Sequence, residues 1–203
     1  ATQNGWQLLR TNASLPMTLS SSMPWQIGFI NIERPGRGVT VSAMGINGAQ
    51  LSQWSKWRPG MWEDLAQTKA DLIILAYGTN EAFSGNLDIS STERTWRNYI
   101  RQIKNTLPNA GILILGAPES LKTAYGSCGN RPVLLSEVQQ MQQRVARDEK
   151  IMFWSWQDAM GGACSMKNWM AQGLAAKDGV HFSAQGYETA ADKLADSLIR
   201  FAQ

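Results

Sequence analysis

The amino-acid sequence predicts an α/β fold built on a doubly wound parallel sheet, with a short β-rich segment before it. Two patterns carry this prediction. Short apolar segments of strand length begin about 33 to 40 residues apart, which is the room that a crossover helix needs between parallel strands. Between these segments, apolar residues recur at helical spacing, and such alternation favours a parallel sheet with helices on its faces.

Four segments are expected to form the strands. They are rich in Val, Ile and Leu, as is typical of strands buried on both faces. In chain order they are VTVSAM (39–44), LIILAY (72–77), ILIL (112–115) and IMFW (151–154).

Three apolar stripes predict the helices that follow these strands. The first stripe consists of Trp96, Tyr99, Ile100, Ile103 and Leu107, and the second of Leu134, Val138, Met141 and Val145. The last helix is expected to place Tyr187, Ala191, Leu194, Leu198 and Phe201 on one face. Ser183 stands where the N-cap of that helix is expected.

Residues 1–38 have a different pattern. WQLLRT, LPMTLS and WQIGFINI are short extended runs broken by Asn, Pro and Gly, without a helical period. We therefore expect two parts, a β-rich segment over 1–38 and the α/β domain over 39–203.

Charge and hydropathy exclude two classes of partner. The net charge of +3 comes from scattered residues and forms no basic patch, so nucleic acid is not an expected partner. No apolar run approaches the roughly 20 residues of a membrane span. The sequence begins at Ala1 without Met or signal peptide, which fits a mature secreted product or a fragment of a longer chain.

Two cysteines, Cys128 and Cys164, lie in the glycine-rich stretches YGSCGN and GGACSM. Without a CxxC motif or a companion His, they are not expected to bind a metal. Two readings remain open: free thiols, or a disulfide between two loops that implies an oxidising compartment.

Candidate functional residues follow the expected strands, where parallel sheets bind ligands. Gly45 and Asn47 come after the first strand, and Gly78, Asn80 and Glu81 come after the second. Glycine N–H groups and Asn side chains can hold an oxyanion, although Gly and Asn are also ordinary turn residues.

The third candidate motif contains the only histidine of the chain, His181, three residues after Asp178. A carboxylate at this spacing can bind one imidazole nitrogen, fix the tautomer and stabilise the imidazolium. In that arrangement the other nitrogen is free to act as a general base.

Taken together, Gly45, GTNE (78–81) and DGVH (178–181) resemble the blocks of the SGNH hydrolases, also called GDSL esterases. The resemblance spans residues 39–203 and implies a flavodoxin-like sheet and a serine esterase without metal or organic cofactor. It implies that Gly45 N–H and the Asn80 side chain donate to the oxyanion, that His181 is the base and that Asp178 orients it. Glu81 stands where the family usually has Asp, and it is expected to support the catalytic residues without acting on the substrate itself.

A finer resemblance involves GFINIERPGRG, GINGAQLSQW, GTNEAF and DGVHFSAQGY, which look like bacterial peptidoglycan O-acetylesterases. These enzymes remove O-acetyl groups from a glycan in the periplasm or cell wall, and they carry a carbohydrate-binding-type β-sandwich inserted between the first two blocks. Residues 1–38 would then be the tail of that module. We expect Asn47, Trp54 and Trp57 to contact the O-acetylated glycan.

The nucleophile of such an enzyme is absent from this sequence, which contains neither Gly-Asp-Ser nor Gly-x-Ser-x-Gly. We therefore expect an upstream segment or a separate fragment to supply Gly-Asp-Ser as a partner. Two alternatives remain. One is an O-acetyltransferase with the same triad, and the other is a glycan-binding relative without catalysis, which the nine tryptophans also fit.

Overall fold

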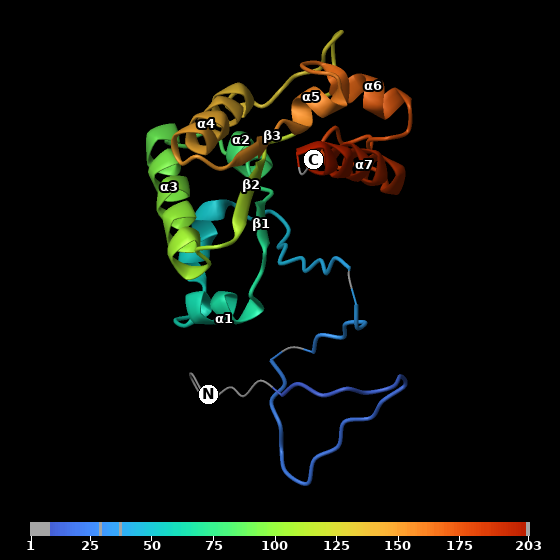
Figure 1. The fold of residues 1–203 in the computed structure, drawn as a ribbon. Helices are drawn as coiled ribbons and strands as arrows, with labels where there is room; N and C mark the ends of the chain where they lie inside the picture. Colours follow the sequence, from blue (N-terminus) through green and yellow to red (C-terminus); the bar gives the residue numbers. More distant parts are fainter. Residues whose placement is uncertain (1–8, 29, 37, 202–203) are drawn as a thin grey trace. The chain divides into compact units, whose positions relative to one another are not determined.

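The computed structural model describes residues 9–28, 30–36 and 38–201, and it divides the chain into two units, Ala1–Gly45 and Ile46–Gln203. The second unit contains all the helices and strands that the structure describes (Figure 1). In chain order they are η1 (Leu51–Lys56), α1 (Met61–Thr68), β1 (Leu72–Leu75), α2 (Thr79–Phe83), α3 (Ile89–Thr106), β2 (Gly111–Leu115), α4 (Leu135–Asp148), β3 (Met152–Trp154), α5 (Trp156–Met160), α6 (Ser165–Ala171) and α7 (Ala184–Phe201).

The sheet is parallel and has the strand order β1-β2-β3. Leu72 pairs with Gly111, and Leu113 pairs with Met152. Three of the four predicted strands are thereby confirmed, with a helix between each strand and the next. Among the described residues β1 has a single neighbour, so its other edge carries no partner strand.

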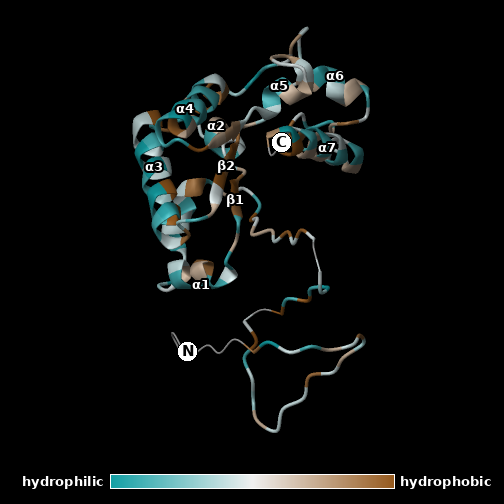
Figure 2. Ribbon diagram, in the orientation of Figure 1, coloured by the Kyte–Doolittle hydropathy of each residue, from teal (hydrophilic) through white to brown (hydrophobic). Residues whose placement is uncertain are grey.

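One face of the sheet packs against α3 and α4. Leu75, Ile112 and Ile114 point to this side and lie in one buried core with the α3 and α4 stripes. Both predicted stripes are confirmed, because their members within α3 and α4 are buried; Leu107 and Leu134 cap the ends of these helices. Figure 2 shows the resulting contrast between apolar β1 and β2 and the polar outer surface of α3. Arg97 and Arg101 of α3 hold α4 from outside through ion pairs to Glu149.

The opposite face of the sheet carries α7 beside β3. Phe153 packs in the α3–α4 core, whereas the next residue, Trp154, donates its indole N–H to Ser197 of α7 at 3.2 Å. Since neighbouring side chains of a strand point to opposite faces, α7 lies on the second face. The coverage is partial, because Ile74 of β1 is 43% exposed.

The inward face of α7 differs from the predicted one. Gly186 and Ala190 are buried, whereas Tyr187 and Phe201 of the predicted stripe are 47% and 77% exposed. The reason is a close approach at Gly186, where a Cβ would lie 1.8 Å from the Leu174 carbonyl oxygen. Ser183 is the N-cap as predicted, and its Oγ accepts the N–H of Gly186 at 3.1 Å.

The strand predicted at 39–44 does not form in this structure. The described residues of the first unit form no helix or strand, and Val39 and Val41 are almost fully exposed. A strand needs a neighbour to pair its backbone groups, and no described segment pairs with 39–44. The predicted β-rich segment lies partly outside the described residues, at 1–8, 29 and 37.

The described helices differ from membrane spans in length or in hydropathy. None of the helices that the structure describes combines the length and the apolar character needed to cross a bilayer.

Candidate active site

The turn that carries His181 is built around the Asp178 carboxylate. Asp178 Oδ1 accepts the backbone N–H groups of Val180 and His181 at 2.8 and 3.0 Å, and Oδ2 lies 2.8 Å from His181 Nδ1. Gly179 completes the turn at φ +70°, a conformation that favours glycine. The imidazole therefore has one nitrogen held and its Nε2 directed away from the carboxylate, and its side chain is 72% exposed.

The electrostatics of this pair favour a charged carboxylate. Partial burial opposes ionisation, but the hydrogen bonds from the His181 ring and from the two backbone N–H groups outweigh it and lower the pKa of Asp178 to about 2. At neutral pH, Asp178 is thus an anion that can orient the imidazole and stabilise an imidazolium.

Buried neighbours hold this turn on both sides. The Leu121 N–H donates to the Gly179 carbonyl at 2.8 Å, and the Ala176 N–H donates to the His181 carbonyl at 2.8 Å. Phe182, next to His181, is buried against Trp156 and Trp169. The loop is therefore fixed while the imidazole itself stays accessible.

The second candidate turn begins after β1 and is organised by Glu81. Its buried carboxylate accepts the Leu51 N–H and the Gly78 N–H, both at 2.9 Å. Burial raises the pKa of the Glu81 carboxyl, and these two hydrogen bonds offset part of the rise. The support predicted for Glu81 is thus a bridge between the 78–81 turn and η1.

Asn80 lies at the surface of this turn. Its side-chain amide donates to the Ala49 carbonyl at 2.9 Å, and Gln50 Nε2 donates to the Asn80 carbonyl at 3.2 Å. An Asn side chain has two N–H donors, so one remains for a ligand.

The other predicted site residues, Gly45, Asn47, Trp54 and Trp57, lie in different surroundings. Gly45 belongs to the first unit, and Asn47 lies exposed in the turn 46–49 of the second. Trp54 packs in the core, where its indole N–H donates to the Tyr77 hydroxyl at 2.9 Å, and Trp57 stacks on it at 4.6 Å between ring centroids. Trp54 and Trp57 are both half-buried.

Cys128 and Cys164 form a disulfide, with a Cα–Cα distance of 4.8 Å. Beside it Glu119 is fully buried, accepts Gln157 Nε2 at 2.5 Å and the Cys164 N–H at 3.3 Å, and lies 2.7 Å from Arg131 Nε. The disulfide reading of the cysteines is therefore correct, whereas no pattern in the sequence pointed to Glu119.

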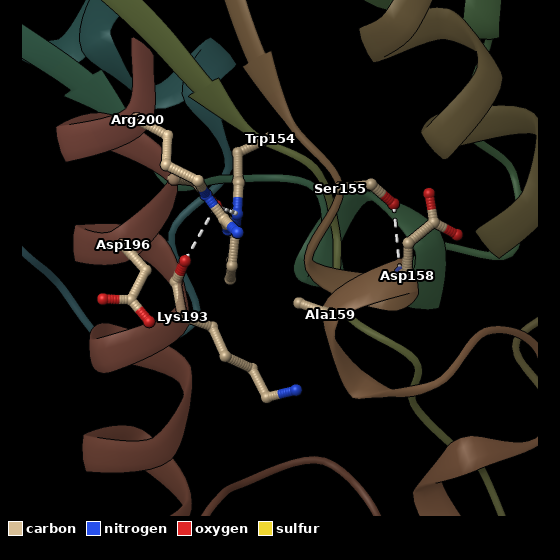
Figure 3. Close-up of a pocket in the computed structure, with 8 residues that line it drawn as sticks. Trp154, Ser155, Asp158, Ala159, Lys193, Asp196 and Arg200 are labelled. Atoms are coloured by element: carbon tan, nitrogen blue, oxygen red, sulfur yellow. Dashed lines mark hydrogen bonds between the residues drawn. The ribbon is translucent and has the colours of Figure 1, made fainter. Parts of the chain in front are cut away.

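A pocket lies elsewhere in the second unit. It has a volume of about 360 Å³ and is lined by residues of β3, α5 and α7, among them Trp154, Asp158, Lys193, Asp196 and Arg200 (Figure 3). Neither His181 nor Asn80 contributes to it. Within the part of the chain that the structure describes, no three His, Cys, Asp or Glu side chains gather as a metal site would require.

Comparison with known proteins shows the family of the chain. The GDSL-like lipase/acylhydrolase family model matches residues 22–189. A solved structure described as a peptidoglycan O-acetylesterase in action is 69% identical, with a TM-score of 0.78; the match covers 79% of this chain and 46% of that one, so the chain spans about half the length of this relative. No curated protein matches.

More distant structures share the fold. An acetyl xylan esterase is 16% identical with a TM-score of 0.59, and the match covers 75% of this chain and 78% of that one. A carbohydrate acetylesterase from Sinorhizobium meliloti is 17% identical with a TM-score of 0.54, covering 70% and 66%. The predicted SGNH-type α/β fold is confirmed, and the chain belongs to the GDSL-like lipase/acylhydrolase family.

Proposed function

We propose that this chain supplies the acid–base half of a serine esterase that removes O-acetyl groups from peptidoglycan or a related glycan. The observation that carries the proposal is the Asp178–His181 pair, with its 2.8 Å contact at Nδ1 and an exposed ring. The 69% identity to a peptidoglycan O-acetylesterase supports the substrate class.

In the proposed reaction, a serine Oγ attacks the acetyl carbonyl carbon while His181 Nε2 takes the serine proton. The Asn80 amide, together with the Gly45 N–H, stabilises the oxyanion. The bond to the glycan oxygen then breaks, and His181 returns the proton to that oxygen. Water, deprotonated by His181, attacks the acetyl-enzyme and releases acetate and the free serine. Asp178 remains ionised throughout.

The serine comes from a polypeptide segment outside this sequence. In a flavodoxin-like order, the strand that carries it lies between the strand expected at 39–44 and the strand that the structure forms as β1. Among the described residues, 39–44 has no partner strand and β1 has none at its outer edge, and each observation supports a missing strand. The greater length of the 69% identical relative supports the same proposal.

Residues 1–38 belong, in this proposal, to a carbohydrate-binding-type β-module. Their described part exposes large apolar side chains such as Leu9, Trp25 and Ile32, which a β-sandwich would bury. Asn47, Trp54 and Trp57 are proposed to contact the glycan. The compartment is the periplasm or the cell exterior, where peptidoglycan lies, and the Cys128–Cys164 disulfide fits this oxidising location.

The test combines this chain with the polypeptide that carries Gly-Asp-Ser and measures acetate release from O-acetylated peptidoglycan. His181→Ala should lower kcat by several orders of magnitude. Lys177→Ala, an exposed neighbour of the turn, is the control and should leave kcat within threefold. A fluorophosphonate should label the serine of the partner polypeptide only when His181 is present.

Each other outcome identifies an alternative. Acetate release that survives His181→Ala within tenfold contradicts the role of His181. Transfer of acetyl to a glycan hydroxyl indicates an O-acetyltransferase. Binding of a peptidoglycan fragment without acetate release indicates a non-catalytic relative.

A further inference from the structure

The two candidate turns of the second unit, 78–81 and 178–181, share no direct hydrogen bond among the described residues. A serine esterase needs its oxyanion donor and its base at a fixed separation, because both act on the same carbonyl group. Some other part of the fold must therefore set the distance between Asn80 and His181.

Gln142 of α4 occupies the position that can do this. Its side chain is fully buried between the ends of two strands. Gln142 Nε2 donates to the Tyr77 carbonyl at 2.7 Å, and Gln142 Oε1 accepts the Ala117 N–H at 2.8 Å. One amide thus joins Tyr77 and Ala117, which lie two positions beyond the ends of β1 and β2.

The first hydrogen bond falls on the peptide unit that leads into the 78–81 turn, and the second falls on a segment that is hydrogen-bonded to the 178–181 turn. The Tyr77 carbonyl belongs to the same peptide unit as the Gly78 N–H, which Glu81 binds from the other side at 2.9 Å. Ala117 opens a buried segment, 117–121, whose last N–H donates to the Gly179 carbonyl. Gln142 is therefore the link between the Asn80 turn and the Asp178–His181 turn.

The local sequence is adapted to this link. Gly78 has φ +121°, and a Cβ there would lie 2.7 Å from Gln142 Nε2 and 2.9 Å from the Ala117 Cβ. Gln139, one helical turn before, donates to the Ala117 carbonyl at 2.8 Å and holds the same residue a second time. A buried amide costs free energy unless both its ends are paired, and here each end is paired with a backbone group.

We infer that Gln142 is a positioning residue, which sets the separation between the Asn80 oxyanion donor and the Asp178–His181 base. It touches neither substrate nor reacting atoms, and it acts through the two backbone segments that it joins. The catalytic part of this inference rests on the proposed function, whereas the structural coupling can be measured on this chain alone.

The first experiment uses nuclear magnetic resonance on the full chain, in which His181 is the only histidine and gives a unique ring signal. Gln142→Met keeps the size of the side chain and removes both hydrogen bonds. It should shift the Asn80 side-chain amide and the His181 ring signals together. Gln143→Met, at the exposed neighbouring position of α4, should shift neither. Unchanged Asn80 and His181 signals in a folded Gln142→Met chain would overturn the inference.

The second experiment measures acetate release by the esterase complex. Gln142→Met should lower kcat about 30- to 100-fold with KM within threefold, because an ångström of misplacement affects the chemical step more than binding. Thermal unfolding is recorded alongside, since a merely structural role would lower the melting temperature and leave kcat of the folded enzyme unchanged.

Gln142→Glu adds a pH readout and covers the case in which Gln142→Met fails to fold. An ionised Glu places a second acceptor against the Tyr77 carbonyl, whereas a protonated Glu can donate there and still accept from Ala117. The ratio of variant to wild-type kcat should therefore rise toward 1 as the pH falls, and Gln143→Glu should show a constant ratio. A kcat ratio for Gln142→Glu that does not change with pH contradicts the positioning role. A wild-type complex that releases no acetate contradicts the proposed function instead. In that case the magnetic resonance experiment still tests whether Gln142 couples the two turns.

Discussion

Replacing Glu81 should show how much a single buried carboxylate contributes to the architecture of the site. Glu81 is almost fully buried and accepts two backbone N–H groups, from Leu51 and Gly78, each at 2.9 Å. A hydrogen bond to a charged group contributes about 1.5–3 kcal/mol, and part of the sum is offset because the carboxylate no longer has to be buried. We expect Glu81→Ala to lower the free energy of unfolding by about 3–4 kcal/mol.

Glu81→Gln should cost less, about 2 kcal/mol, because one amide oxygen still accepts a hydrogen bond. The amide nitrogen then faces the N–H of either Leu51 or Gly78, and this donor–donor contact causes the loss. The measurement is urea unfolding of the full chain, and Glu63→Gln on α1 is the control at an exposed carboxylate.

The pH dependence of the stability difference between wild type and Glu81→Gln tests whether burial raises the pKa of Glu81. Burial raises the folded-state pKa of Glu81 above its ordinary value of 4.5, so folding takes up a proton at this group. The stability it contributes is fully present below pH 4.5 and is lost as the pH rises through the folded pKa. Glu81→Gln lacks this titration. The difference in free energy of unfolding between wild type and variant should therefore widen as the pH falls from 7 to 4.5. A gap that narrows over this range would show that the hydrogen bonds outweigh burial, and the reasoning would be refuted.

Three further predictions concern the disulfide, the β1 turn and the histidine turn. Replacing Cys128 and Cys164 by Ser should lower the free energy of unfolding by about 4 kcal/mol, since the bond closes a loop of 36 positions; reduction of the wild type should give the same melting curve as the double variant. Gly78→Ala should cost about 2–3 kcal/mol because its Cβ would lie 2.7 Å from Gln142 Nε2 at φ +121°; Gly85→Ala, with open space at its Cβ, should cost under 1 kcal/mol in the same assay. Asp178→Asn should cost about 1 kcal/mol at pH 7, a value reduced for the exposure of the pair. The cost should shrink below pH 3.8 and be small at pH 2, because the stability that the lowered pKa of Asp178 gives is lost as the pH falls through about 2; an equal cost at pH 7 and pH 2 would contradict this.

The sequence predicted those parts of the fold that depend on local periodicity. The strands β1, β2 and β3 and the stripes of α3 and α4 followed from apolar spacing alone, because each element buries one face against its neighbours in the same domain. The Asp178–His181 pair was predictable for the same reason, since its contact forms within one turn.

Features that depend on distant partners could not be predicted. The segment 39–44 has strand-like composition and no neighbour to pair with, so composition alone misled. The inward face of α7 is decided by the approach of Gly186 to Leu174, which helical spacing cannot reveal. Gln142 looks like its exposed neighbours Gln140 and Gln143 in the sequence, and only the packing of α4 on the strand ends distinguishes it.

One edge of β1 has no partner strand among the described residues, and this has a practical consequence for anyone who handles this chain by itself. Such an edge presents a row of free backbone donors and acceptors, and Ile74 beside it is 43% exposed, which together form a template for aggregation. Association in concentrated samples would then proceed edge to edge, through pairing of β1 strands from two copies of the chain. Co-expression with the proposed Gly-Asp-Ser segment should therefore reduce this association, if that segment pairs with the edge of β1 as proposed.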